Sequence, residues 1–262
     1  MGGLGTHRHL LVTVVVILLG VTLATVLPTT AGVFDIKPSL PPEQYGNILI
    51  DRLSSANKMK PVIFSHWSHR RFYTCRVCHS ELDFNMKVNT TEITEQASRA
   101  GKYCGACHDG RIAFRHQGNC DRCHTGSLES GVENFVDFTS RPLPFTEYGN
   151  GIDWSEALRR KQIIPKNYLR KKSLDIPFEK TLFLESDWSI ITPTIFPHKE
   201  HIAWLECGSC HPELFDIKKK STKNLNMRTI LQGEFCGVCH LNVAFPMDDC
   251  TRCHPQMRPG GP

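Results

Sequence analysis

The sequence predicts a mostly irregular fold with short α-helices, built as two tandem modules. All twelve cysteines fall into six copies of the phrase Cys-x-x-Cys-His. Three copies in the first half of the chain, beginning at Cys75, are repeated in the second half, beginning at Cys207. The frequent glycines and prolines (19 and 16 residues) favour loops with brief helices around each phrase and little β-sheet.

Cys-x-x-Cys-His is the attachment phrase of c-type haem. Two thiols three residues apart project from one turn and add to the two vinyl groups of a haem, while the adjacent histidine supplies the first axial ligand of the iron. Zinc binding or disulfide bonds would leave the histidine after every second cysteine unexplained. The phrases therefore predict six covalently attached haem c groups. The predicted thioether cysteines are Cys75, Cys78, Cys104, Cys107, Cys120, Cys123, Cys207, Cys210, Cys236, Cys239, Cys250 and Cys253, and the histidines that follow them are His79, His108, His124, His211, His240 and His254.

The haems are expected to form much of the interior. The first three phrases lie within Phe64–His124, which leaves only about 20 residues for each haem. So short a segment cannot cover three macrocycles with a shell of peptide. We therefore expect the peptide to wrap the two triheme modules around six haems, and the chain without haem to be largely unfolded.

The repeat extends beyond the cysteines and gives the domain boundaries. Phe64–His69 matches Phe196–His201 in the pattern Phe-x-His-x-x-His, and a shared Ala-Phe precedes the third phrase of each half. Duplication of a three-haem unit explains both matches. The predicted parts are a leader (1–31), a first triheme module (32–124), a connector (125–193) and a second triheme module (194–262).

The connector contains no cysteine or histidine. Within it, Tyr148–Asn150 repeats the Tyr-Gly-Asn of Tyr45–Asn47, and Asp153–Gln162 has apolar spacing compatible with a short helix. We expect the connector to pack over haem edges through aromatic residues that include Trp154, Tyr168, Phe178, Phe183 and Trp188.

The leader predicts export from the cytoplasm. An uncharged apolar run, Leu10–Leu27, follows Arg8 and ends in small residues, with possible cleavage after Ala31. The run is also near the lower length limit for spanning a bilayer, so an uncleaved anchor in the inner membrane is the alternative. Both readings predict a periplasmic or cell-envelope location, where haem c is attached.

The formal net charge of +5 does not indicate a nucleic-acid partner. Six haems would add roughly −12 from propionates and roughly +6 from ferric porphyrin centres, so much of the basic excess offsets the cofactors. The basic runs Arg170–Lys172 and Lys218–Lys220 are expected to be solvated faces.

Too few histidines remain to give every haem two. Two of the thirteen, His7 and His9, lie in the leader and six follow attachment cysteines. At least one haem therefore needs a ligand other than histidine, or has an open position. Two pairs of histidines, His66 with His69 and His198 with His201, are spaced three residues apart. The two members of a pair would share one face of a helical turn and could bind two neighbouring haems. The predicted distal ligands are His66, His69, His198, His201 and His116, with Met227 and Met247 as further candidates.

The combined pattern resembles the triheme cytochrome c7 family. It comprises Phe-x-His-x-x-His, the attachment phrases, Gly-Lys-Tyr-Cys-Gly-Ala-Cys-His and Ala-Phe, and it covers Pro61–His124 and Thr194–Pro255. The resemblance implies electron-transfer modules of the kind common in dissimilatory metal-reducing bacteria. It also implies that the first histidine of each pair serves the first haem and the second histidine serves the second haem.

The resemblance is less direct for the third haem. In the family its distal ligand lies just ahead of the second phrase and is His or Met, which implicates Met227. The matching position in the first module is Glu95, so His116 or Met86 would have to serve there. Methionine favours ferrous iron and would make such a haem more oxidising than its neighbours.

The predicted function is electron transport rather than catalysis, in anaerobic respiration or metal reduction. No nucleophile triad, phosphate loop or paired-carboxylate site is present in the sequence. We expect redox protein partners, with an inner-membrane donor and a periplasmic or outer-membrane acceptor. The alternatives are a multihaem enzyme that reduces a small oxyanion at a haem with an open position, and a membrane-anchored cytochrome that oxidises quinol.

Overall fold

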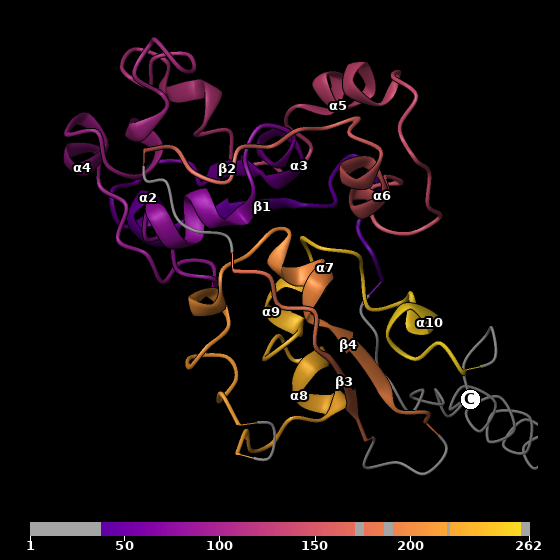
Figure 1. Ribbon diagram of the computed structural model, residues 1–262. Coiled ribbons are helices and arrows are strands. Elements are labelled where there is room, and N and C mark those ends of the chain that lie inside the picture. The colour runs from indigo at the N-terminus through magenta and orange to yellow at the C-terminus, as the bar shows by residue number, and fades with distance from the viewer. Residues whose placement is uncertain (1–37, 171–175, 186–190, 219–220, 258–262) are drawn as a thin grey trace, which may run out of the picture. The chain divides into compact units, whose positions relative to one another are not determined.

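The computed structural model describes residues 38–170, 176–185, 191–218 and 221–257. The leader and its apolar run Leu10–Leu27 lie outside these residues. Within the described part of the chain, no helix combines the length and apolarity needed to cross a membrane. Figure 1 shows the elements in order along the chain.

A two-stranded antiparallel hairpin followed by a short helix precedes the first attachment phrase in each half of the chain, and the first strand of the second hairpin lies in the connector. In the first, β1 (Asn47–Ile50) pairs with β2 (Val62–Ser65), and β2 runs directly into α3 (His66–Arg70). In the second, β3 (Thr181–Leu184) pairs with β4 (Thr194–Pro197), which runs into α7 (His198–Ile202). The hairpins fix where the paired histidines begin.

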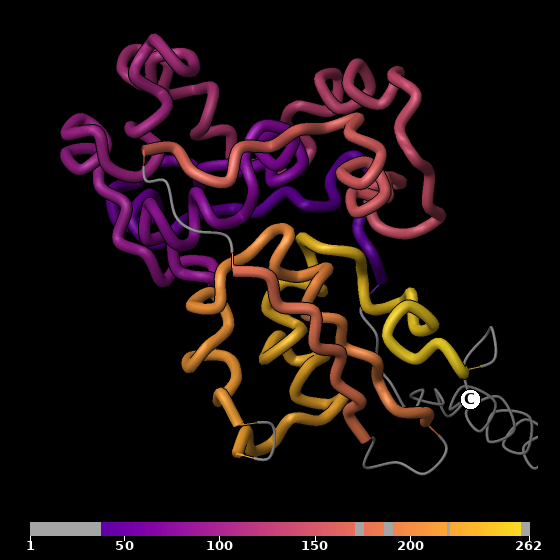
Figure 2. The backbone as a smooth tube through the Cα atoms, in the orientation of Figure 1, coloured from indigo at the N-terminus to yellow at the C-terminus, as the bar shows by residue number. Residues whose placement is uncertain are grey.

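The rest of the chain consists of single helical turns and loops, which confirms the predicted fold class (Figure 2). Helices this short are not stable alone, so packing and caps must hold them. Thr94, Asp153 and Asn226 each cap a helix by accepting a hydrogen bond from a backbone N–H three residues on, at 2.9–3.1 Å. The short helices outside the two hairpin units are α2 (Arg52–Ala56), η1 (Val77–Glu81), α4 (Glu95–Arg99), η2 (Tyr103–Ala106), η3 (Cys120–Arg122), α5 (Val132–Thr139), α6 (Trp154–Arg159), η4 (Cys207–Ser209), α8 (Met227–Leu231), α9 (Gly237–His240) and α10 (Cys250–Cys253).

The connector contributes most of a small hydrophobic core. Trp67 of α3 packs edge-on against Phe135 and stacks with Phe138, and Phe138 in turn stacks with Trp154 of the predicted helix, now α6. The other buried members are Ile152, Ala157 and Ile163.

The connector's other aromatic residues behave differently. Phe178 and Phe183 are 45% and 57% exposed, and Trp188 lies outside the described residues. Trp154 thus packs in the hydrophobic core, and the expectation that the connector packs over haem edges stays a prediction.

Each of the two Tyr-Gly-Asn segments uses its asparagine to bind the indole of a core tryptophan. Asn47 and Asn150 are both buried, and the Oδ1 of each accepts a hydrogen bond from a tryptophan indole, Trp67 and Trp154 respectively, both at 3.1 Å. The glycine before each asparagine has a left-handed φ, +91° and +60°, which glycine adopts without steric cost. The weak sequence echo thus marks two equivalent supports of the connector core.

Several contacts join the first module to the second. The Arg76 guanidinium donates to the carbonyl oxygens of Ile202 and of Leu205 (Nε to O, 3.0 Å), at the end of α7. The hydroxyl of Ser80 lies 3.2 Å from that of Ser209. The first attachment turns of the two modules therefore pack against each other.

Candidate haem-binding site

The attachment phrases fold as helical turns. In five of them the N–H of the histidine donates to the carbonyl of the first cysteine at 2.9–3.0 Å, for example from His108 to Cys104. One such turn brings residues three apart onto the same side, so both thiols of a phrase can reach one haem. All twelve thiols are free of disulfide bonds.

Burial keeps several of the thiols protonated. It raises the pKa of Cys78, Cys236 and Cys239 to about 12, and that of Cys104 and Cys253 to about 11. Buried, protonated thiols are poor metal ligands and are slow to oxidise. These sites therefore suit thioether formation with a vinyl group better than metal binding by thiolates.

Every described histidine is oriented in the same way. The Nδ1 atom of each lies 2.6–3.1 Å from a backbone carbonyl oxygen. Because a carbonyl only accepts hydrogen bonds, Nδ1 must carry the proton, and Nε2 keeps its lone pair. This is the arrangement that fixes a metal-binding imidazole and directs Nε2 at the metal. The eleven are His66, His69, His79, His108, His116, His124, His198, His201, His211, His240 and His254.

Two pairs of histidines have the spacing of axial ligands. The ring centroids of His69 and His108 are 6.2 Å apart, and those of His201 and His240 are also 6.2 Å apart. A bond of about 2 Å from each imidazole nitrogen to a metal between them would place the centroids roughly 6 Å apart. The second histidine of each Phe-x-His-x-x-His pattern, His69 or His201, thus lies opposite the histidine of the second attachment phrase of its module. His66 lies near His79, whose charge contributes to lowering the pKa of His66.

A phenylalanine supports each distal pair. Phe64 stacks on His69 at 4.5 Å and meets His66 edge-on at 4.8 Å. Phe196 makes the same contacts with His201 and His198, at 4.3 and 4.9 Å. The Phe of the pattern Phe-x-His-x-x-His therefore holds both imidazole planes, a role that its position in the sequence did not reveal.

His116 has a buried nitrogen with no hydrogen-bond partner. Its Nδ1 bonds to the carbonyl of His108 at 2.8 Å, and its Nε2 is buried and unpaired among the described residues. A buried polar atom without a partner is costly, and coordination of iron would satisfy it. This observation fits a haem ligand rather than a surface histidine.

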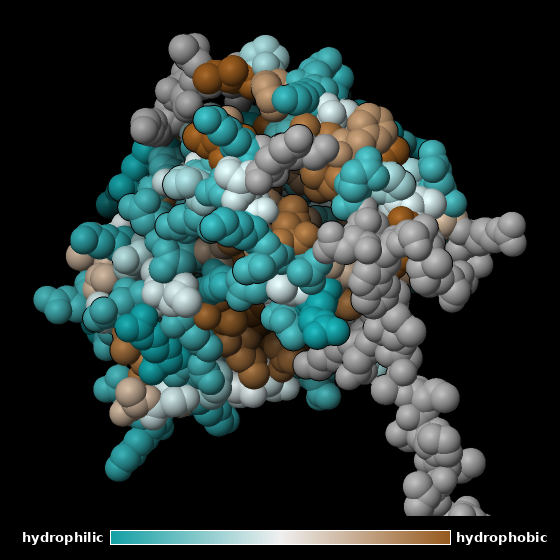
Figure 3. All heavy atoms as spheres, turned by 90° about the horizontal axis from the view of Figure 1, so that it is seen from below, coloured by the Kyte–Doolittle hydropathy of each residue, from teal (hydrophilic) through white to brown (hydrophobic). Residues whose placement is uncertain are grey.

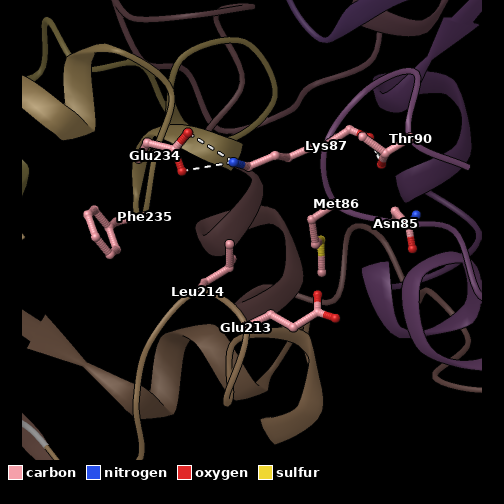
Figure 4. Close-up of a pocket in the computed structure, with 8 residues that line it drawn as sticks. All are labelled: Asn85, Met86, Lys87, Thr90, Glu213, Leu214, Glu234 and Phe235. Atoms are coloured by element: carbon pink, nitrogen blue, oxygen red, sulfur yellow. Dashed lines mark hydrogen bonds and ion pairs between the residues drawn. The ribbon is translucent and has the colours of Figure 1, made fainter. Parts of the chain in front are cut away.

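The candidate methionines lie at three separate places. Met227 is the first residue of α8 and Met247 precedes α10, both partly buried. Met86 lines a cavity of about 280 Å³ shared with Leu214 and Phe235 of the second module, beside the Lys87–Glu234 ion pair (Figure 4). The cavity places Met86 against the second module.

The third attachment phrase of the second module has a polar neighbour. The Nε2 of His254 lies 3.3 Å from the hydroxyl of Thr194, while Nδ1 bonds to the carbonyl of Thr192 at 2.6 Å. A small side chain thus faces the nitrogen that would bind iron.

Apolar surface remains exposed between polar side chains on the face shown in Figure 3. Among the described residues, Phe145, Ile164 and Ile217 are 81%, 78% and 82% exposed.

Comparison with known proteins agrees with this geometry. The family model of cytochrome c7 and related cytochrome c matches residues 62–125 and 194–255. No curated protein matches the sequence.

Three solved structures are similar to the chain. The C-terminal hexaheme fragment of GSU1996 is 25% identical over 80% of this chain and 96% of the fragment, with a TM-score of 0.27. The dodecaheme cytochrome c GSU1996 is 25% identical over 82% of this chain and 76% of that chain, with a TM-score of 0.28. The N-terminal hexaheme fragment is 24% identical over 81% and 99%, with a TM-score of 0.26. Since both segments that carry the attachment phrases match one family model, the chain belongs to the cytochrome c7 and related cytochrome c family, in two tandem modules.

Proposed function

We propose that this multihaem cytochrome carries six haem c groups and passes electrons between redox protein partners at the cell envelope. Electron transfer follows from the family. The observation that supports six fully organised haem sites is the common orientation of all eleven described histidines, each with Nδ1 held by a backbone carbonyl. Anaerobic respiration or metal reduction is the pathway proposed for it.

The proposed axial ligands follow from the measured pairs and from the repeat. His69 serves with His108 and His201 with His240, and the first histidine of each pair serves the first phrase, as His66 with His79. We assign His116 to the third haem of the first module and Met227 to that of the second. When bound, haem c supplies a one-electron couple at each site.

The protein controls the orientation and the protonation state of the histidines that would bind the haem iron. The carbonyl acceptors hold each imidazole neutral and aimed, so little rearrangement accompanies a change of iron charge. Burial lowers the pKa of His66 to about 3 and that of His240 to about 4. Both imidazoles therefore stay unprotonated, and available to iron, across the neutral range.

A second candidate function is reduction of a small oxyanion at one haem. Eleven described histidines cannot fill twelve axial positions, so at least one haem needs another ligand or keeps an open position. The third haem of the second module, attached at Cys250 and Cys253, has no candidate histidine assigned as its second ligand. A haem with an open or displaceable position at this site would favour that function. Quinol oxidation by an anchored form depends on Leu10–Leu27, outside the described residues.

The test is the intact mass of the purified holoprotein together with near-infrared magnetic circular dichroism of its ferric form. We expect six haems, all low-spin, mostly with two histidine ligands and one with histidine and methionine. Fewer than six haems would contradict the cofactor count. A distinct high-spin population, or rapid binding of cyanide or nitrite to many ferric haems, would favour the reductase instead.

A further inference from the structure

Arg70 is a half-buried cation, with a buried Nε, at the contact between the modules. It ends α3, directly after His69. Its guanidinium donates to the carbonyl of Val243 at 2.9 Å and lies 5.0 Å from the ring centre of Trp154. Its Nε is buried and has no hydrogen-bond partner among the described residues. The second module has Ile202 at the equivalent position, so this cation occurs once rather than twice.

The contact to Val243 brings the charge to an attachment turn of the other module. The N–H of Val243 donates to the carbonyl of Cys239 at 3.0 Å, so the segment that receives Arg70 is hydrogen-bonded to the second phrase of the second module. Arg70 itself lies five residues before Cys75, the start of the first phrase of the first module. The guanidinium therefore lies between two haem attachment turns from different modules.

The electrostatic surroundings agree with that position. The titratable side chains that lie nearest to Arg70 electrostatically are Cys75, Tyr45 and Cys239, and none is a carboxylate that would neutralise the guanidinium. Arg70 in turn helps to lower the pKa of both His66 and His240. Burial lowers the pKa of Arg70 itself, but a guanidinium begins so far above neutrality that it keeps its proton.

Neighbouring contacts hold the cation in place. The hydroxyl of Tyr45 donates to the carbonyl of Ala244 at 2.6 Å, next to Val243. The backbone N–H of Arg76 donates to the carbonyl of Trp204 at 3.2 Å. These contacts join the two modules around Arg70, and the side chain of Arg70 adds its own hydrogen bond to the carbonyl of Val243.

We propose that Arg70 is a positioning cation shared by two haems of different modules, the one attached at Cys75 and Cys78 and the one attached at Cys236 and Cys239, and that it raises the reduction potential of both. A ferric centre that gains an electron loses one unit of positive charge. A fixed positive charge nearby therefore favours the ferrous form, and it does so more strongly in a buried site than in water. The two sites become matched electron acceptors on either side of the module contact. This inference rests on the proposed function, since it requires haem at both turns.

The experiment compares Arg70→Met, Arg70→Lys and Arg71→Met in the full-length holoprotein. Arg71→Met is the matched control, because the Arg71 guanidinium lies over Phe72 and Phe138 (4.4 and 5.0 Å) and faces Arg141 and Asp137 rather than an attachment turn. Each variant is first checked for six haems by intact mass and for low-spin iron by its spectrum. The potentials of individual haems are then resolved by redox titration followed by NMR.

Arg70→Met is expected to lower the reduction equilibrium constant of two haems about tenfold, which is 59 mV for a one-electron couple, and to leave the other four unchanged. Arg70→Lys should retain most of the wild-type values. The Arg71 guanidinium acts on His69 rather than on His66 or His240, so Arg71→Met should leave the potentials of these two haems unchanged. Six unchanged potentials, or a uniform shift of all six, in a six-haem low-spin Arg70→Met protein would overturn the role of Arg70. A wild-type protein without six low-spin haems would instead contradict the proposed function.

Discussion

The carbonyl oxygen of Ser98 occupies the space that any side chain at Gly105 would need. A Cβ at Gly105 would overlap that oxygen, and a Cβ at Gly237 in the second module would overlap the carbonyl oxygen of Ile230 in the same way. Both glycines follow the first cysteine of the second attachment phrase. The helix that precedes this phrase, α4 or α8, therefore packs directly on the attachment turn.

Gly105→Ala and Gly237→Ala should each destabilise the holoprotein by about 1–3 kcal/mol, because a backbone carbonyl cannot move aside as a flexible side chain can. Chemical denaturation of the holoprotein measures the change. Gly208→Ala is the matched control: it follows the first cysteine of another phrase, and a Cβ there meets nothing within 4 Å. Equal tolerance of all three substitutions would show that α4 and α8 do not pack this closely.

Asn47→Leu should cost about 1–3 kcal/mol by leaving buried groups unpaired. Asn47 accepts from the Trp67 indole at 3.1 Å and donates to the carbonyl of Leu128 at 2.8 Å. Asn57→Leu is the control, since Asn57 is exposed and bonds only within its own turn, to the carbonyl of Leu53. The penalty should shrink when Trp67 is already Phe. An unchanged penalty in the double variant would mean that the indole bond contributes nothing.

His116→Ala should convert one ferric haem from low-spin to high-spin, because its buried Nε2 is the proposed sixth ligand. His116→Met should restore a low-spin haem with a higher potential. Near-infrared magnetic circular dichroism distinguishes these states, and Gln117→Ala serves as the neighbouring control. A fully low-spin spectrum in His116→Ala would leave His116 with a structural role only.

Stability should fall as the pH falls below about 6.5, the ordinary histidine pKa in an unfolded chain. Burial lowers the pKa of His66 to about 3 and of His240 to about 4 in the fold. Between these values and 6.5 the unfolded chain binds more protons, so the folded state is progressively disfavoured. Competition between protons and iron for Nε2 acts in the same direction. Denaturation midpoints of the holoprotein between pH 7 and pH 4 measure the effect, and a flat profile would contradict it.

The sequence alone determined those features that depend only on residues close together along the chain. Attachment of haem needs two cysteines and a histidine within five residues, so each turn could be recognised without knowledge of the fold. The helix within Asp153–Gln162 was predictable for the same reason, since its cap, Asp153, bonds three residues along the chain. The spacing of His66 and His69 placed both on one turn.

Only the tertiary structure decided which distant residues meet. The 6.2 Å approach of His69 and His108, the packing of Trp67 into the connector core and the contact of Arg70 with Val243 join segments separated by many residues. No local pattern encodes such contacts, because they arise from how hairpins and turns pack together. The periodicity of a helix or a strand shows on which face of the element a side chain lies, but not which distant residue it contacts.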